Sequence, residues 1–129
     1  MAKPNGLAFS PDETILYVGD TGVTHQKGGP RHIRKFAIES GALKELGVFA
    51  TCTAGLFDGF RVDLSGRVWA GAGDGVHCFD PDGTMIGKIR IPETVANLTF
   101  GGAKRNRLFI TARQSLYAVY VVANGAGRG

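Results

Sequence analysis

Two polar residues, Asn5 and Asp58, have side chains and surroundings that suit a metal ion. Each is followed by a glycine and a short apolar run, so each stands at the start of an expected β-strand. Amide and carboxylate oxygens are hard ligands that suit Ca²⁺, Mg²⁺ or Mn²⁺. Taken alone, however, Asn-Gly and Asp-Gly are also common turn sequences. The choice depends on whether the surrounding elements bring Asn5 and Asp58 together.

An internal repeat gives Asn5 and Asp58 equivalent positions. Two apolar runs separated by a polar turn occur three times, and the first runs cover residues 5–9, 58–62 and 96–100. Each repeat continues into a third run, and the first two repeats add a fourth, which predicts antiparallel meanders. Sheet units that recur every ~40–50 residues are typical of β-propeller blades. Because the first strand of a blade lines the central channel, both side chains are expected to face one opening.

The sequence therefore predicts an all-β protein that makes up about half of a β-propeller. The three expected blades lie near residues 4–50, 57–92 and 95–121, within a domain of residues 1–122. The third blade lacks a fourth strand, and the Gly-rich residues 123–129 are expected to form a flexible tail. A propeller needs at least ~4 blades to close, so three units cannot complete a ring alone.

Three stretches of the sequence resemble the gluconolactonase/regucalcin (senescence marker protein) family. The first is Pro4-Asn-Gly-Leu-Ala-Phe-Ser-Pro-Asp-Glu13, and the second is Phe57-Asp-Gly-Phe-Arg-Val-Asp63 with the strand that follows it. The third, residues 95–121, is similar to the C-terminal end of bacterial and fungal gluconolactonases. The resemblance implies a β-propeller of the six-bladed lactonase type, about twice as long as this chain.

The resemblance also implies a function for the predicted metal site. Members of this family are lactone hydrolases that hold one divalent cation at the channel mouth, with a Glu, two Asn and one Asp as ligands. On the matching motifs, Asn5 and Asp58 are metal ligands, and Asp58 is also the catalytic general base toward a water. Ca²⁺ is the expected cation, with Mg²⁺, Mn²⁺ or Zn²⁺ as alternatives, and a sugar lactone is the expected substrate. The other ligands are expected in an N-terminal half outside this sequence.

Other polar residues admit a functional and a structural interpretation. His25 lies in the longest insertion, whose start resembles a loop of bacterial gluconolactonases, so it is a candidate substrate-binding residue; a solvated loop histidine is the alternative. His32 and His77 are expected to be ordinary sheet residues. No GxSxG motif occurs, which favours direct attack by water over an acyl-enzyme. Five aspartates are expected to form turns rather than a calcium-binding loop: Asp12, Asp63, Asp74, Asp80 and Asp82.

The composition limits the class of protein. The 129 residues are 43% hydrophobic and 20% charged, which suits one small soluble domain. The net charge of +4 comes from scattered basic residues without interleaved aromatics, so no nucleic-acid surface is expected. Cys52 and Cys78 are expected to be unpaired thiols. There is no apolar run of ~20 residues and no signal peptide in this chain, so a cytoplasmic location without membrane contact is expected, unless a longer natural chain carries a targeting segment.

These features favour a gluconolactonase-like hydrolase fragment that needs a second copy, or the missing half, to be active. The alternative is a non-catalytic half-propeller that self-associates or binds a partner. Three units of a six-bladed ring sweep about half a turn, so a two-fold axis along the channel would place a second copy where the other half belongs. A homodimer is therefore expected, with Asn5 and Asp58 of both copies at one channel mouth.

Overall fold

Eleven β-strands form three antiparallel sheets in the computed structural model, which describes residues 1–24 and 26–126. In every sheet, strands that follow one another in the sequence are hydrogen-bonded neighbours. The described residues contain no α-helix, and the 3-10 turn η1 (Gly22–Thr24) is short. The first sheet consists of β1 (Pro4–Phe9), β2 (Ile15–Asp20), β3 (His32–Glu39) and β4 (Ala42–Thr51), the second of β5 (Phe60–Val62), β6 (Val68–Ala72), β7 (Gly75–Phe79) and β8 (Met85–Arg90), and the third of β9 (Val95–Gly101), β10 (Arg107–Ala112) and β11 (Leu116–Tyr120).

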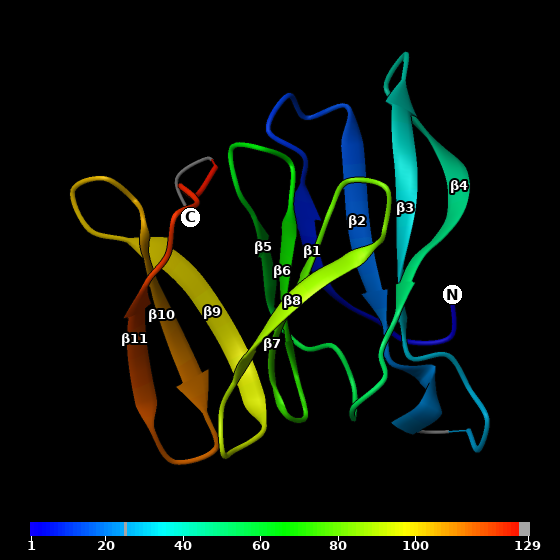
Figure 1. Cartoon of the computed structure of the whole chain (residues 1–129). Coiled ribbons are helices and arrows are strands. Elements are labelled where there is room, and N and C mark those ends of the chain that lie inside the picture. Colours follow the sequence, from blue (N-terminus) through cyan, green and yellow to red (C-terminus); the bar gives the residue numbers. More distant parts are fainter. Residues whose placement is uncertain (25, 127–129) are drawn as a thin grey trace.

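The three sheets stand side by side, with the second sheet between the other two (Figure 1). Their first strands lie next to one another, because β1 contacts β5 and β5 contacts β9. This arrangement confirms the predicted all-β fold and its repeated sheet units. Among the described residues, no helix is long and apolar enough to cross a membrane.

The turns between strands use the predicted aspartate chemistry. Asp12 and Asp82 each accept a backbone N–H from the residue two positions later, at 3.1 and 2.8 Å. Asp63 does the same with Ser65 at 2.8 Å, and its other carboxylate oxygen accepts the indole N–H of Trp69 at 2.9 Å. The buried Asp63 thus ties the turn between β5 and β6 to the face of the second sheet.

Two apolar cores join neighbouring sheets, and the second sheet contributes to both. Phe60 and Val62 face the core shared with the first sheet, where Phe57 and Phe79 meet edge to face at 5.6 Å. Trp69 lies on the other face and meets Phe100 of the third sheet at 5.9 Å. Because side chains alternate along a strand, one sheet can serve two cores. Cys52 and Cys78 are unpaired, as predicted, and the structure shows that both are buried.

The segment after β11 returns to the second sheet. The Leu64 N–H donates to the Asn124 carbonyl at 2.7 Å, and the Ala126 N–H donates to the Val62 carbonyl at 3.0 Å. The sequence predicts a flexible tail over residues 123–129; residues 124–126 make these contacts, and 127–129 lie outside the described residues. A Cβ on Gly125 would overlap Phe100, so this glycine permits close packing.

Candidate functional site

Asn5 and Asp58 line the same two adjoining cavities, of about 420 and 180 Å³. Asn5 lies on β1, and Asp58 lies two residues before β5. The two residues come from neighbouring sheets, and the contact between β1 and β5 brings them together. The repeat therefore places an amide and a carboxylate at one opening, as its register predicts.

The glycines that follow these two residues let the inner strands approach closely. A Cβ on Gly6 would lie 3.0 Å from the Asp58 carbonyl oxygen, and a Cβ on Gly59 would overlap the Asn97 side chain. The backbone of Asp58 is also fixed, because its N–H donates to the Gly71 carbonyl at 3.0 Å. At these two positions the Asn-Gly and Asp-Gly sequences serve strand packing around the site rather than a tight turn.

The carboxylate of Asp58 lacks a compensating partner. No hydrogen bond or ion pair from residues 1–24 or 26–126 reaches it, and desolvation raises its pKa although the side chain is exposed at the cavity mouth. A desolvated carboxylate without a donor or cation gains stability when a cation binds. Together with the amide oxygen of Asn5, it fits the hard oxygen ligands that Ca²⁺ prefers.

Two residues are too few to complete such a site. Ca²⁺ takes 6–8 oxygen ligands. Among the described residues, no group of three or more His, Cys, Asp or Glu side chains is arranged to hold a metal ion. Asn5 and Asp58 alone could therefore supply only part of such a shell.

The larger cavity contains residues that the sequence did not single out. Lys3, Thr24 and Thr94 line it beside Asn5 and Asp58, and the Lys3 ammonium donates to the Thr24 hydroxyl at 3.3 Å. Lys3 and Asn5 are two positions apart, and side chains two apart along an extended chain point to one side. The spacing of Lys3 and Asn5 in the sequence could therefore have indicated that both line one cavity. Asn97, which lines the smaller cavity, follows the repeat position by one residue and gave no such signal.

The structure tests the predictions for two of the three histidines. His25, the candidate substrate-binding residue, lies outside the described residues. His32 lies on β3, where burial foremost and then the Arg34 charge lower its pKa. His77 lies fully buried on β7, so both are sheet residues as predicted.

Asp74 has a larger structural role than a turn residue. Its carboxylate lies 2.6 Å from Nε2 of His77 and accepts from the Lys88 ammonium at 3.0 Å. The hydrogen bond with His77 is the main cause that lowers the pKa of Asp74 to about 2. The adjacent Gly73 N–H donates at 2.7 Å to the carbonyl of Ala54, in the segment that leads to Asp58. The pair therefore fixes a turn at the edge of the candidate site.

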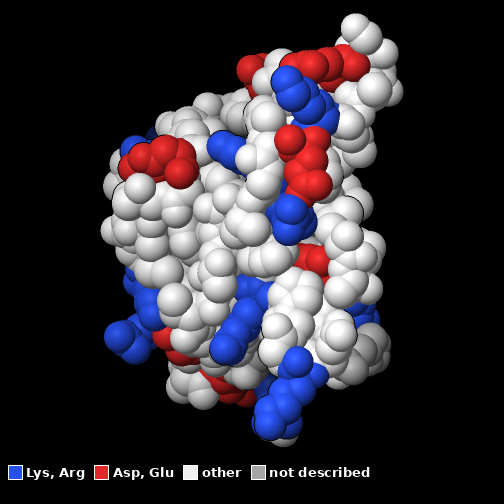
Figure 2. All heavy atoms as spheres, turned by 90° about the vertical axis from the view of Figure 1, so that its right-hand side faces the viewer, with Lys and Arg blue, Asp and Glu red and all other residues white. Residues whose placement is uncertain are grey.

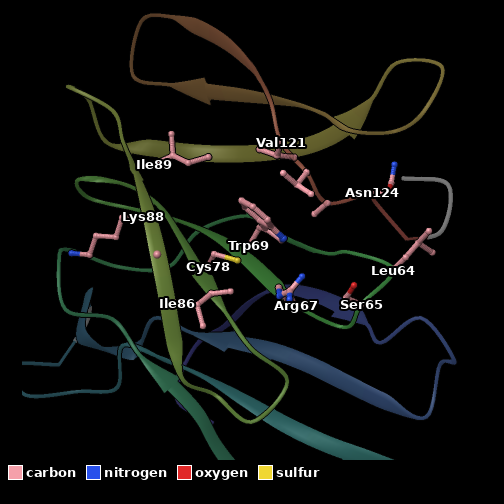
Figure 3. A pocket seen from close by; sticks show the side chains of 13 residues that line it. Leu64, Ser65, Arg67, Trp69, Cys78, Ile86, Lys88, Ile89, Val121 and Asn124 are labelled. Atoms are coloured by element: carbon pink, nitrogen blue, oxygen red, sulfur yellow. The ribbon is translucent and has the colours of Figure 1, made fainter.

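Another cavity, of about 520 Å³, lies away from the two that Asn5 and Asp58 line (Figure 3). Trp69, Ile86 and Ile89 of the second sheet face Val121 across it. It lies beside the three-stranded third sheet and contains neither Asn5 nor Asp58. No carboxylate is among its described lining residues, so it does not suit a metal ion.

Sequence comparisons identify related proteins of known class. The family model described as SMP-30/Gluconolactonase/LRE-like region matches residues 1–114. The chain is 34% identical to a gluconolactonase of Zymomonas mobilis over 132 residues, which cover 92% of this chain and 35% of that protein. It is 33% identical to pentonolactonase XacC of Haloferax volcanii over 115 residues, which cover 84% of this chain and 37% of that protein. The chain thus spans about a third of the length of these curated relatives.

Structural comparisons give the same result. A gluconolactonase from Xanthomonas campestris superposes with a TM-score of 0.85 at 44% identity, over 93% of this chain and 38% of that one. Regucalcin from Agrobacterium tumefaciens, a calcium-binding protein, superposes with a TM-score of 0.74 at 24% identity, over 98% and 48% of the two chains, a likeness that shows the fold. These neighbours are propellers, so the three sheets are blades of that fold.

Proposed function

Because the chain belongs to the SMP-30/gluconolactonase/LRE-like family, we propose that it supplies part of a metal-dependent site for sugar-lactone hydrolysis. One observation carries the proposal: Asn5 and Asp58 line one cavity, and no described residue neutralises the Asp58 carboxylate. The names of the relatives, a gluconolactonase and a pentonolactonase, support a sugar lactone as the substrate class.

The two residues have distinct roles in this proposal. Asn5 offers a neutral amide oxygen to the cation, and Asp58 offers a charged carboxylate oxygen. A divalent cation bound there would polarise the lactone carbonyl and lower the pKa of a nearby water. Asp58 also accepts a proton from the attacking water, a role that its raised pKa favours. Addition of water to the carbonyl carbon and cleavage of the ring C–O bond yield the hydroxy acid. An oxygen-only donor set favours Ca²⁺ over Zn²⁺, which prefers nitrogen and sulfur ligands.

A second copy of the chain is the proposed source of the missing ligands. Leu7 and Phe9 point away from the core because Ala8 between them packs into it, and both are exposed. On the side of the molecule that lies at the right in Figure 1, charges of both signs are interspersed among uncharged atoms (Figure 2). A two-fold axis along the channel would cover Leu7 and Phe9 and bring a second Asn5 and a second Asp58 to the same opening.

A non-catalytic half-propeller is the second candidate. The observation in its favour is the incomplete ligand set, because Asn5 and Asp58 alone cannot surround a cation. Such a protein would keep the fold and the cavity but would not turn over a lactone.

The test measures Ca²⁺ binding by calorimetry and gluconolactone hydrolysis by acid release, in the wild type and in Asp58→Asn. We expect metal-dependent hydrolysis that the variant loses together with metal binding. The unfolding temperature at pH 7 should not fall, because a carboxyl with a raised pKa costs stability as pH rises through its titration range. Hydrolysis that survives in Asp58→Asn would refute the role of Asp58. A folded wild type without metal binding or turnover would favour the non-catalytic candidate.

A further inference from the structure

Lys3 is a cation that faces the candidate site without an anionic partner. It is the one Lys or Arg among the described residues that line the larger cavity. Its ammonium donates to the Thr24 hydroxyl at 3.3 Å, and no Asp or Glu in residues 1–24 or 26–126 forms an ion pair with it. Its positive charge is therefore available to a ligand in the cavity.

The position of Lys3 is fixed although the residue lies near the start of the chain. The carboxylate of Asp20, which is buried, accepts the Lys3 N–H at 2.8 Å and the Ala2 N–H at 2.8 Å. The Lys3 carbonyl accepts the Thr21 N–H at 3.0 Å. Both backbone groups of Lys3 thus have partners, and the side chain projects from a fixed point at the cavity wall. A lysine held in this way loses less conformational freedom when it binds a ligand.

The other groups of the cavity suit a polyhydroxylated molecule. The Thr24 and Thr94 side chains add hydroxyls that can donate to or accept from sugar hydroxyls. Asp58 carries a negative charge and would repel the carboxylate of a sugar acid. A lysine in the same cavity offsets that repulsion and can donate a charge-assisted hydrogen bond.

We propose that Lys3 determines specificity for sugar acids by binding their carboxylate in this cavity. The inference rests on the proposed function, since it assigns the carboxylate of the hydrolysis product to Lys3. A polyol of similar length without a carboxylate should bind more weakly, because it gives Lys3 no anion to pair with.

The test compares binding of gluconate and of glucitol to the full chain by NMR titration, with a chelator present so that no metal contributes. We expect the wild type to favour gluconate by about tenfold, the effect of one charge-assisted hydrogen bond. Lys3→Met should reduce gluconate binding to the glucitol level, and Lys3→Arg should restore the preference. Lys44→Met, which removes an exposed charge on β4, is the control and should behave as the wild type.

The outcomes separate this inference from the proposed function. A gluconate preference that depends on Lys3, in a chain that does not hydrolyse lactones, would support the inference and refute the hydrolase proposal. Equal preference in the wild type and Lys3→Met would overturn the inference, even if the lactone is hydrolysed. A wild type that does not distinguish gluconate from glucitol would overturn it as well.

Discussion

The buried pair of His77 and Asp74 links the stability of the protein to pH. His77 has no exposed surface, its Nε2 lies 2.6 Å from the Asp74 carboxylate, and its Nδ1 has no partner among the described residues. The close contact with a carboxylate indicates that Nε2 carries the proton and donates. Asp74 therefore fixes the orientation of the ring and anchors the turn between β6 and β7.

Replacement of Asp74 by Asn tests this pair. A carboxylate with a lowered pKa stabilises the fold above its unfolded value of 3.8, and that stability is lost as pH falls from 3.8 through about 2. Because Asp74 is 29% exposed, we expect Asp74→Asn to lower the free energy of unfolding by about 1–2 kcal/mol at pH 7. Urea unfolding at pH 7 and pH 2.5 measures the effect, and the difference from the wild type should shrink at pH 2.5.

A matched control exists in the same sheet. Asp80 pairs with Arg67 at 3.2 Å, and both side chains are about two-fifths exposed. An exposed pair contributes ~1 kcal/mol or less, so Asp80→Asn should cost less than Asp74→Asn. Equal losses in the two variants would contradict a special role for the pair of His77 and Asp74.

At the level of single residues, the sequence predicted what depends on the repeat and missed what depends on contacts between distant segments. That Asn5 and Asp58 line one cavity was predictable because both occupy the first position of the repeated sequence unit. The fixed position of Lys3 depends on the Asp20 carboxylate, 17 residues away. The role of Asp74 depends on a histidine across a turn and a lysine on the next strand. Side-chain pairing of this kind leaves no periodic pattern in a sequence.

The inner strands pack closely at Gly59, where the second sheet meets the third. Its N–H donates to the Ala96 carbonyl at 2.9 Å, and a Cβ at this position would lie within 2.9 Å of the Asn97 Cα. We expect Gly59→Ala to lower the free energy of unfolding by about 1–3 kcal/mol, the usual cost of an overpacked site. It should also displace Asn97 from the smaller cavity. Urea unfolding measures the loss.

The control for this variant is Gly87→Ala on β8, where a Cβ would meet no atom within 4 Å. That substitution should change the free energy of unfolding by no more than about 0.5 kcal/mol. If the two variants were equally stable, the result would contradict the close packing of Gly59 against Asn97.

At the level of elements, the turn residues made the strands and their antiparallel order predictable. The close packing of the backbone of one segment against another segment could not be predicted from the sequence. Asp12, Asp63 and Asp82 occur between apolar runs, and each forms the expected local hydrogen bonds. The Gly-rich end of the chain shows how packing by glycine escapes a reading of composition. Gly125 permits contact with Phe100, so its small size serves packing there, whereas glycine composition alone suggests flexibility.

The whole molecule has two outer sheets, each with one face that no other described residues cover. On the first sheet, Leu7 and Phe9 point outward. On the third sheet, Phe109 and Tyr120 point outward with the Arg107 guanidinium over both rings, at 5.2 and 5.1 Å, because the alternate residues of β10 enter the core. Apolar and aromatic side chains on flat sheet faces are typical of surfaces that meet another protein.

If a second copy covers these faces, a charge on one of them should prevent association without unfolding the chain. Leu7 is 61% exposed, so Leu7→Lys should keep the fold and its circular dichroism spectrum while it replaces an apolar contact by a charge. Light scattering should give twice the 13.6 kDa chain mass for the wild type and the single chain mass for the variant. Leu64→Lys is the matched control, because Leu64 is 63% exposed but lies in the turn between β5 and β6, away from both outer faces. That variant should remain dimeric.

Because the proposed metal site needs ligands from both copies, Leu7→Lys should also lose Ca²⁺ binding although Asn5 and Asp58 are intact. A wild type that stays monomeric at micromolar concentration, or a Leu7→Lys monomer that binds Ca²⁺ as the wild type does, would show that one chain does not depend on a second for its site.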